Sequence, residues 1–429
     1  MREALTPRRA RAAAALALTD EVLLIGAGEP VPVPGGADQT YPFLAHTEYV
    51  WLAANECPGA VLAFDPREGW TEFAPPVTAA ERVWEGRADT PGVPLPELQG
   101  WLAARRGRPV VNLGAPLPGL REESPRTAEL REALTHARRP KDEAEIALLR
   151  RAAAATAAGF AAALPFLRAG ASEREVQVEL EAGFFRAGGE RTGYGTIVGA
   201  GPNSGVLHVN PSARRLAPGD TVLIDAGAEI ARYTADVTRT WRVAGGGDPG
   251  VFRDLYALVL AVEEHAIARC TPGAEWRDVH LAAAHEIATG LVALDLLRGE
   301  PAALVERDAH ALFFPHGLGH LVGLGVRDAS GYLPGRARSM RPGLAMLRTD
   351  LPLEPGYVIT VEPGVYFVPA LLQDPALRAR HHDAVNWARA ESLLGFGGIR
   401  IEDDVLVTAG APEVLTAAVP KSPDHALRG

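Results

Sequence analysis

The sequence predicts an α+β protein, with a small α/β domain in front of a larger α+β domain. Its 429 residues favour two or three domains, because domains usually contain about 100–200 residues. Short apolar runs alternate with turn residues over the first ~115 residues, as in an α/β domain. After Pro140, long amphipathic helices alternate with β-rich stretches. We therefore expect domains at residues 1–136 and 137–429.

The N-terminal domain is expected to form a sheet with few helices. An apolar run at residues 12–18 predicts a short helix before the first strand. Leu95–Arg105 predicts another helix, and Gly114–Pro140, rich in Pro, Arg and Glu, is expected to be a linker with a helical stretch at Ala128–His136. The strands are predicted at Val22–Ile25, Tyr49–Leu52, Ala60–Phe64 and Pro109–Leu113.

Long helices and β-rich stretches alternate in the larger domain. Lys141–Leu167 carries apolar residues at helical spacing, and acidic residues in its first turns suit the helix dipole. Ser172 followed by Glu175 has the pattern of a capping box, which predicts a helix to about Ala187. The other predicted helices are Val251–Cys270 and Trp276–Leu297, and the β-rich stretches are Thr221–Asp225, Tyr233–Val243, Val358–Phe367 and Gly398–Thr408.

The composition excludes several classes of partner. Lys and Arg number 43 against 53 Asp and Glu, a net charge of −10, whereas nucleic-acid binding needs a basic face. No stretch approaches the ~18–20 apolar residues that span a bilayer, so we expect no membrane partner. Cys57 and Cys270 lie far apart, which suits a reducing compartment where thiols stay free. We therefore expect a soluble, cytoplasmic protein.

Five chemically active side chains interrupt apolar segments of the larger domain. A charge in such a run is costly unless it is paired or bound to a metal. Asp225 ends one β-like run and Asp236 follows eleven residues later, a spacing that suits two neighbouring antiparallel strands. Glu362 and Glu402 interrupt two further runs, and His320 closes a segment whose glycines permit close backbone approach.

Together these five side chains favour a metal site. Alone, each acid is typical of a solvated strand face, and the histidine is typical of a core position. Four carboxylates, however, carry a charge that two divalent cations would offset, and oxygen ligands with one imidazole suit Mn²⁺, Co²⁺, Fe²⁺ or Zn²⁺. Two such ions ~3.5–4 Å apart deprotonate a water and stabilise a tetrahedral intermediate. The residues therefore predict a two-metal hydrolase.

Five segments around these side chains carry a family resemblance. They are Leu223-Ile-Asp-Ala-Gly, Thr234-Ala-Asp-Val-Thr-Arg-Thr, His316-Gly-Leu-Gly-His-Leu-Val-Gly-Leu, Thr360-Val-Glu-Pro-Gly-Val-Tyr and Gly398-Ile-Arg-Ile-Glu-Asp-Asp. They resemble the pita-bread metallopeptidases, and among these the proline-specific enzymes prolidase and aminopeptidase P. The resemblance runs from Arg139 to the C-terminus, and more faintly through Tyr41-Pro-Phe and Cys57-Pro-Gly-Ala-Val. It implies a pita-bread catalytic domain behind a smaller α/β domain that dimerises and caps the substrate.

The resemblance implies two divalent metal ions, with Mn²⁺ expected ahead of Co²⁺, Zn²⁺ or Fe²⁺. Asp225 would chelate one ion, and Asp236 and Glu402 would bridge the pair. His320 and Glu362 would complete the other ion, with Glu362 also shuttling protons. A metal-bridging hydroxide would attack the carbonyl before the proline. Because the proline nitrogen is a poor leaving group, its protonation matters as much as formation of hydroxide.

Further residues would contact the substrate. His208 and His316 match histidines of the family's pocket and are expected to take part in catalysis. Arg348 matches an arginine that grips the terminal carboxylate of a dipeptide, and Arg400 matches another near the site. A packing role remains the alternative for both arginines. Tyr194 has a counterpart near the metals, with a core position as its alternative.

The chain departs from the family at Arg327. The family commonly has Val-His-Asp after the Gly-His motif, whereas this chain has Val326-Arg-Asp. That histidine helps to hold the substrate, and an arginine can donate to an oxyanion or carboxylate but cannot act as an acid or base near neutral pH. In the N-terminal domain, Trp51 matches a tryptophan that caps the site from the partner subunit, although a core position suits it equally. Phe43-Leu-Ala-His-Thr stands where relatives often have an Arg-Gln pair.

We therefore expect a homodimeric Xaa-Pro dipeptidase that cleaves small peptides with proline in the second position. The segment Gly343-Leu-Ala-Met-Leu-Arg-Thr and the long insertion at Val368–Phe396 have the layout of the animal-type prolidase. An aminopeptidase P, acting on longer Xaa-Pro peptides, is the alternative with the same chemistry. A non-catalytic binding module is the alternative from another class. The complete set of metal ligands argues against that module, and against the metal-free creatinase-like amidinohydrolases.

Overall fold

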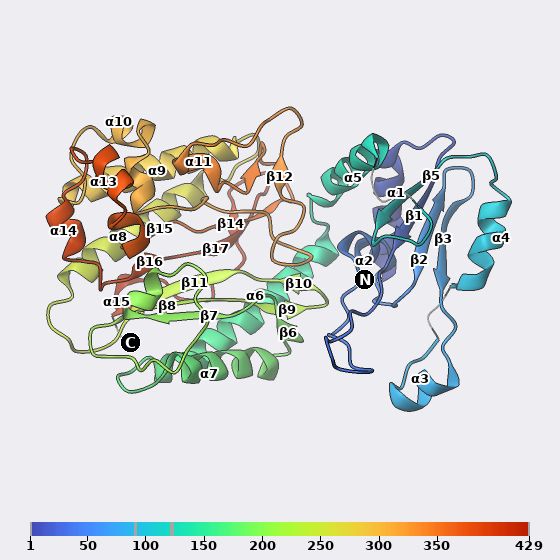
Figure 1. Ribbon diagram of the computed structural model, residues 1–429, viewed down its shortest axis with the longest axis horizontal. Coiled ribbons are helices and arrows are strands. Elements are labelled where there is room, and N and C mark those ends of the chain that lie inside the picture. Colours follow the sequence, from blue (N-terminus) through green and yellow to red (C-terminus); the bar gives the residue numbers. More distant parts are fainter. Residues whose placement is uncertain (1, 90–91, 121–123, 428–429) are drawn as a thin grey trace. The chain divides into compact units, whose positions relative to one another are not determined.

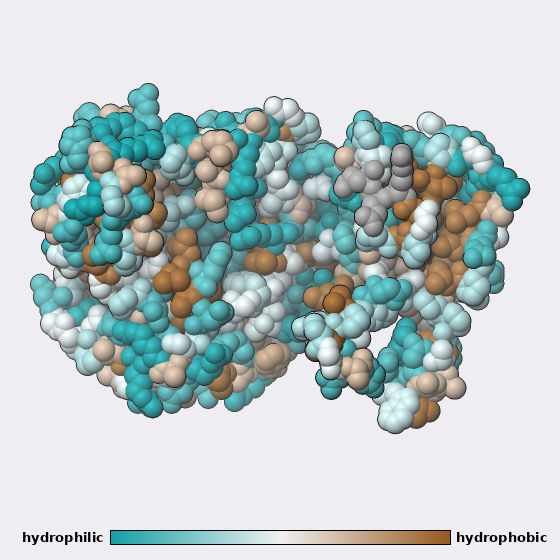
Figure 2. Space-filling view, in the orientation of Figure 1, coloured by the Kyte–Doolittle hydropathy of each residue, from teal (hydrophilic) through white to brown (hydrophobic). Residues whose placement is uncertain are grey.

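The computed structural model describes residues 2–89, 92–120 and 124–427, and it divides the chain into two compact units (Figure 1). Unit 1 comprises Met1–Arg138, and unit 2 comprises Arg139–Gly429. Cys57 and Cys270 are both free and buried. In the view of Figure 2, hydrophobic surface shows beside α4 (Leu98–Ala103) of unit 1, while hydrophilic residues cover much of unit 2.

Unit 1 is built on a five-stranded sheet with the order β4-β3-β2-β1-β5. Strands β1 and β5 are parallel, while β1, β2 and β3 form antiparallel pairs. The strands are β1 Val22–Gly26, β2 Val61–Asp65, β3 Gly69–Ala74, β4 Val93–Pro94 and β5 Val110–Gly114, and the other helices are α1 Arg2–Leu16, α2 Thr47–Ala53, α3 Ala79–Trp84 and α5 Pro125–Arg138. The expected linker helix is α5, and it packs on α1 within unit 1.

The prediction of a strand at Tyr49–Leu52 is wrong, because these residues lie in helix α2. His46 caps the helix by accepting a hydrogen bond from the Glu48 backbone N–H, and Ala54 ends the helix in the left-handed conformation. Every residue from Glu48 to Ala53 is buried. A helix that is buried on all sides shows no polar face, so its short apolar run looks like a buried strand.

Asp65, at the end of β2, forms a buried ion-pair cluster with two arginines of unit 1. Its carboxylate is 1% exposed and accepts hydrogen bonds from Arg105 Nε at 2.6 Å and Arg108 Nη1 at 2.8 Å. The hydrogen bonds from Arg108 contribute most to holding the pKa of Asp65 well below its usual range. Asp65 therefore stabilises unit 1 above the unfolded-state pKa of about 3.9, and this contribution is lost as the pH falls through the folded-state value.

We expect Asp65→Asn to destabilise unit 1 by about 3 kcal/mol at pH 7, because it removes one partner of a buried ion pair. The difference from the wild type should shrink as the pH falls below 4, because the Asp65 carboxyl is then protonated in the unfolded wild-type chain but still ionised in the folded one. Urea unfolding of both proteins at pH 7 and at pH 3 measures this. An equal difference at the two pH values would contradict the role given to the charge.

Unit 2 places helices on both sides of small sheets, most of which are antiparallel. Helices α6 and α7 cover β7, β9 and β10, whereas α8 packs on β14, β15 and β16 (Figure 1). Its long helices are α6 Glu143–Ala163, α7 Glu173–Arg186, α8 Gly250–Ala268 and α9 Trp276–Ala293, and its short ones are α10 Pro301–Glu306, α11 Pro342–Ala345, α12 Pro369–Leu372, α13 Pro375–Arg380, α14 Trp387–Glu391 and α15 Pro423–Ala426.

The strands of unit 2 fall into five sheets within the described residues. The sheet orders are β10-β9-β6, β11-β8-β7, β12-β13, β14-β17-β18 and β15-β16. The strands are β6 Arg191–Thr192, β7 Ile197–Ala200, β8 Thr221–Ala226, β9 Ala228–Ile230, β10 Tyr233–Thr234, β11 Val237–Arg242, β12 Gly331–Tyr332, β13 Thr349–Asp350, β14 Val358–Val361, β15 Gly364–Tyr366, β16 Gly398–Arg400, β17 Asp403–Leu406 and β18 Glu413–Val414. The predicted β-rich stretches are all present, three of them divided into two strands.

Helices α6 and α7 begin with capping boxes, as the sequence predicts for Ser172. The two helices approach closely because Gly159 and Gly183 face each other, and a Cβ on Gly159 would overlap the Phe184 ring. Among the described residues, the helical segment Glu143–Phe166 has the length and hydropathy of a membrane span, which the sequence analysis did not detect. More than half of it is buried inside unit 2, and the core helices of soluble proteins share this composition.

Candidate metal centre and active site

Strand pairing brings the first two predicted acids together. Asp225 lies near the end of β8, and Asp236 directly precedes β11. The two strands are antiparallel, with Thr238 opposite Asp225, as the eleven-residue spacing predicts. Their carboxylates are linked by the hydroxyl of Tyr194, which lies 2.6 Å from Asp225 Oδ1 and 2.5 Å from Asp236 Oδ1.

A second antiparallel pair brings Glu362 and Glu402 to the same place. Glu362 directly follows β14 and Glu402 directly precedes β17, and these strands pair with Val361 opposite Asp403. A bridge between Thr238 and Glu402 then connects the two strand pairs. The four acids therefore meet because four strand ends converge on one point.

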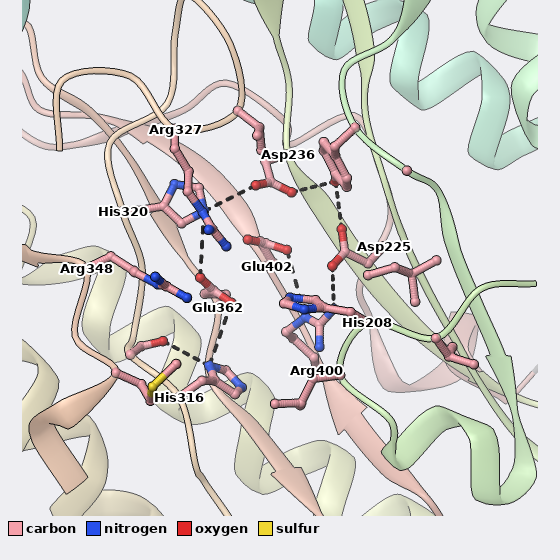
Figure 3. Close-up of a pocket in the computed structure, with 18 of the residues that line it drawn as sticks. His208, Asp225, Asp236, His316, His320, Arg327, Arg348, Glu362, Arg400 and Glu402 are labelled. Atoms are coloured by element: carbon pink, nitrogen blue, oxygen red, sulfur yellow. Dashed lines mark hydrogen bonds and ion pairs between the residues drawn. The ribbon is translucent and has the colours of Figure 1, made fainter. Parts of the chain in front are cut away.

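The five predicted ligands form one cluster (Figure 3). Carboxylate oxygens of Asp225, Asp236 and Glu402 lie within 4.8 Å of one another. His320 Nε2 lies 3.5 Å from Asp236 Oδ2 and 3.9 Å from Glu362 Oε1. The His320 Nδ1 atom faces the Leu321 carbonyl at 3.2 Å, which leaves Nε2 directed at the acids.

The chemistry of this cluster fits divalent metal ions. Burial, followed by the charges of the neighbouring acids, raises the pKa values of Asp236 and Glu402 well above their usual range. Burial also raises the pKa of Glu362 to about 7 and lowers that of His320 to about 4. Four acids that repel one another, beside a neutral imidazole, form a stable site when cations lie between them.

Several residues that sequence reasoning missed hold the ligands in place. The Thr238 hydroxyl donates to Glu402 Oε2 at 2.5 Å, and Asp404 Oδ2 accepts from the Asp236 backbone N–H at 3.0 Å. Thr238 follows Asp236 by two residues and Asp404 follows Glu402 by two residues, so the ligand motifs themselves contain the signal for both. Such supporting hydrogen bonds orient metal ligands and tune their basicity.

Tyr366 is a further residue that sequence reasoning missed. Its hydroxyl accepts a hydrogen bond from Arg400 Nη1 at 2.9 Å and lies 2.9 Å from His316 Nε2. Arg400 is buried, and its guanidinium is also bound to Asp225 and Thr238. Burial, then the charge of Arg400, lowers the pKa of His316 to about 3, so this imidazole is neutral at physiological pH.

The cluster lies in a pocket of about 320 Å³ in unit 2. Besides the five predicted metal ligands, six predicted site residues line this pocket: Tyr194, His208, His316, Arg327, Arg348 and Arg400. Glu362 is predicted both as a metal ligand and as a catalytic residue. Burial and the charge of Arg400 lower the pKa of His208. Met346, which was not predicted, lies at the exposed side of the pocket.

Trp51 is the predicted site residue that the pocket does not include. It lies in α2 of unit 1, with 1% of its surface exposed, and the Arg11 guanidinium is 5.2 Å from its ring centroid. A buried indole offers no surface to a substrate. This burial favours the alternative role, a core aromatic of unit 1, while the capping of a partner subunit's site stays a prediction.

Known proteins resemble the chain over most of its length. The model of metallopeptidase family M24 matches residues 147–409. An Xaa-Pro dipeptidase from Xanthomonas euvesicatoria is 32% identical over 94% of this chain and 95% of its own length. A probable Xaa-Pro aminopeptidase from Botryotinia fuckeliana is 29% identical over 89% of this chain and 86% of its own length.

Solved structures of similar proteins share the fold. Aminopeptidase PepP from Pseudomonas aeruginosa superposes with a TM-score of 0.79 at 27% identity, covering 98% of this chain and 96% of its own. Zinc-substituted aminopeptidase P from Escherichia coli, in complex with product, gives a TM-score of 0.77 at 27% identity and the same coverage. The predicted pita-bread fold, behind a smaller N-terminal domain, is thereby confirmed.

Proposed function

The chain belongs to metallopeptidase family M24, and from this we propose that it is an Xaa-Pro dipeptidase, which hydrolyses the imide bond before a C-terminal proline. The observation that carries the proposal is the complete cluster of four acids and His320 at the floor of a pocket that also contains Arg348. The acids of the cluster would then face the ammonium end of a zwitterionic dipeptide, and Arg348 would face its carboxylate end.

Asp225, Asp236, His320, Glu362 and Glu402 would hold two divalent ions. When bound, such ions supply an activated water and electrostatic stabilisation of the charge that develops on the substrate carbonyl. Glu362 faces both the cluster and His316, whose Nδ1 lies 3.7 Å from Glu362 Oε2. From there its carboxylate would take a proton from the attacking water and deliver it to the proline nitrogen. His208 and neutral His316 would hold the substrate by hydrogen bonds.

Mn²⁺ is the metal we propose, with Co²⁺, Zn²⁺ or Fe²⁺ as substitutes. A set of four carboxylates with one imidazole, and no thiolate in the pocket lining, supports a hard or borderline cation. We also propose a cytoplasmic homodimer. The two buried thiols support a reducing compartment, and the dimer rests on the resemblance to prolidase.

An aminopeptidase P is the second candidate function. It is favoured by the superposition on aminopeptidase P structures over nearly the whole chain. The chemistry would be the same, and the substrate would continue beyond the proline. A non-catalytic module of this fold has no comparable support, because all five ligands are present and clustered.

We expect the manganese-loaded protein to hydrolyse Ala-Pro at least ~10-fold more efficiently than Ala-Pro-Ala, because only the dipeptide offers its carboxylate to Arg348. Release of alanine from both peptides, with added Mn²⁺ and with chelator, measures this. Chelator should remove the activity. A preference for the tripeptide would identify an aminopeptidase P, and no cleavage of either peptide by protein with two bound ions would overturn the proposal.

A further inference from the structure

Two of the three arginines in the pocket form no ion pair with any described residue. Arg400 is bound to Asp225, as described above. Arg327 and Arg348 also line the pocket, yet their guanidiniums form no hydrogen bond or ion pair with any of the residues that the structure describes. Figure 3 shows both side chains directed at the space beside Glu362. Two positive charges therefore face one volume beside Glu362, and neither is bound to that carboxylate.

The electrostatics of the pocket make this arrangement costly without an anion. After burial, the charge of Arg327 is the largest influence that lowers the pKa of Arg348. Both arginines also act on Glu362 and His320, which places their charge beside the metal cluster. Two divalent ions would offset the four clustered acids, so the three guanidiniums of the pocket would remain in excess, and of these Arg400 alone is bound to one of the acids.

Both arginines lie on restrained segments. Asp328, next to Arg327, is buried and forms an ion pair at 3.0 Å with Lys141. Before Arg348, the Leu347 carbonyl accepts a hydrogen bond from the Tyr332 hydroxyl at 2.7 Å, and β13 begins at the next residue. The backbone therefore fixes where the two side chains start, and their convergence is built into the fold.

We propose that Arg327 joins Arg348 in a two-guanidinium subsite that binds the free carboxylate of the substrate's C-terminal proline. The inference rests on the proposed function and specifies its substrate class: dipeptides, whose carboxylate lies one residue beyond the scissile bond. Each guanidinium can donate two parallel hydrogen bonds to a carboxylate. A longer peptide places a neutral amide there and leaves both charges uncompensated.

The substrate pair that tests the subsite is Ala-Pro and Ala-Pro-amide, which differ in the carboxylate alone. We expect Arg327→Gln and Arg348→Gln each to lower kcat/KM on Ala-Pro by about 10- to 100-fold, mainly through KM, since a charge-assisted hydrogen bond has about this value. Hydrolysis of Ala-Pro-amide should change by less than about threefold. The double variant should hydrolyse the two substrates with nearly equal efficiency.

Arg338→Gln is the matched control. Arg338 is an exposed arginine whose charge acts on Arg348, but its Nε donates to the Ala345 carbonyl and it does not line the pocket. It should retain wild-type selectivity. If Arg338→Gln alters selectivity as strongly as Arg327→Gln, the effect is a long-range field and the subsite proposal fails. If Arg327→Gln impairs Ala-Pro and Ala-Pro-amide equally, Arg327 acts on the scissile carbonyl and the proposal also fails.

Binding of proline, measured by calorimetry on the manganese-loaded protein, separates this inference from the proposed function. Proline should bind at least ~10-fold more tightly than prolinamide, and Arg327→Gln should remove most of that difference. This readout needs no turnover. A protein that cleaves no Xaa-Pro peptide but discriminates proline from prolinamide through Arg327 would retain the subsite and lose the proposed activity. Equal binding of proline and prolinamide would overturn the subsite even in an active dipeptidase.

Discussion

Glu402→Gln is expected to lower Ala-Pro hydrolysis by at least ~1,000-fold, which corresponds to about 4 kcal/mol of transition-state stabilisation. The substitution keeps the shape of the side chain, and the amide oxygen can still accept a hydrogen bond from Thr238. It removes, however, one of the three carboxylates that lie within 4.8 Å of one another. Metal content, measured on the purified protein by elemental analysis, should fall by about one ion per chain.

The same substitution should stabilise the metal-free protein. Burial and the charges of Asp236, Glu362 and Asp225 raise the pKa of Glu402, so ionising this group costs stability when no cation is present. We expect the chelated variant to melt at or above the wild-type temperature, while added Mn²⁺ should raise its Tm by less than it raises the wild-type Tm.

An exposed glutamate provides the control for this experiment. Glu413 is paired with Arg150 on the surface, with 43% of its side chain exposed. Glu413→Gln should leave activity, metal content and both melting temperatures unchanged. If Glu402→Gln lowered the melting temperature of the chelated protein and left metal binding intact, the residue would be structural and not a ligand.

The site was largely predictable because charge inside an apolar run is expensive. Asp225, Asp236, Glu362 and Glu402 each interrupt such a run, and this anomaly is local in sequence. The pairing of β8 with β11 followed from spacing in the same way. What the sequence could not provide is contact between distant segments: Thr238 donates to Glu402, 164 residues away.

The fold was less predictable where a segment is buried on all sides, because its sequence then shows no alternation of apolar and polar residues. The capping box at Ser172 is a local hydrogen-bond motif, and the structure contains it. Residues 48–53 are buried on every side of α2, so their periodicity carries no information, and tertiary packing decides that they form a helix. Trp51 is buried in the same helix, and similarity at one position cannot show whether an indole faces a substrate or a core.

The largest expected effect on stability comes from Arg239, which the sequence analysis did not single out. Arg239 lies in β11, is 1% exposed, and donates to the carbonyls of Glu402 at 2.6 Å and Val419 at 2.7 Å. Its Nη2 also lies 2.7 Å from Asp403 Oδ1, in a buried ion pair. The guanidinium thus ties the backbone directly behind the metal cluster to the C-terminal segment.

We expect Arg239→Leu to destabilise unit 2 by about 3–5 kcal/mol, because it leaves the Asp403 carboxylate and several carbonyls with too few donors. Thermal unfolding should show a Tm decrease on the order of 10 °C. Arg150→Leu is the matched control, since it removes an arginine from the exposed pair with Glu413, and it should change the unfolding free energy by less than about 1 kcal/mol. Equal effects of the two substitutions would mean that water replaces the donors of Arg239, and burial of this ion pair would then contribute nothing to holding Glu402 in place.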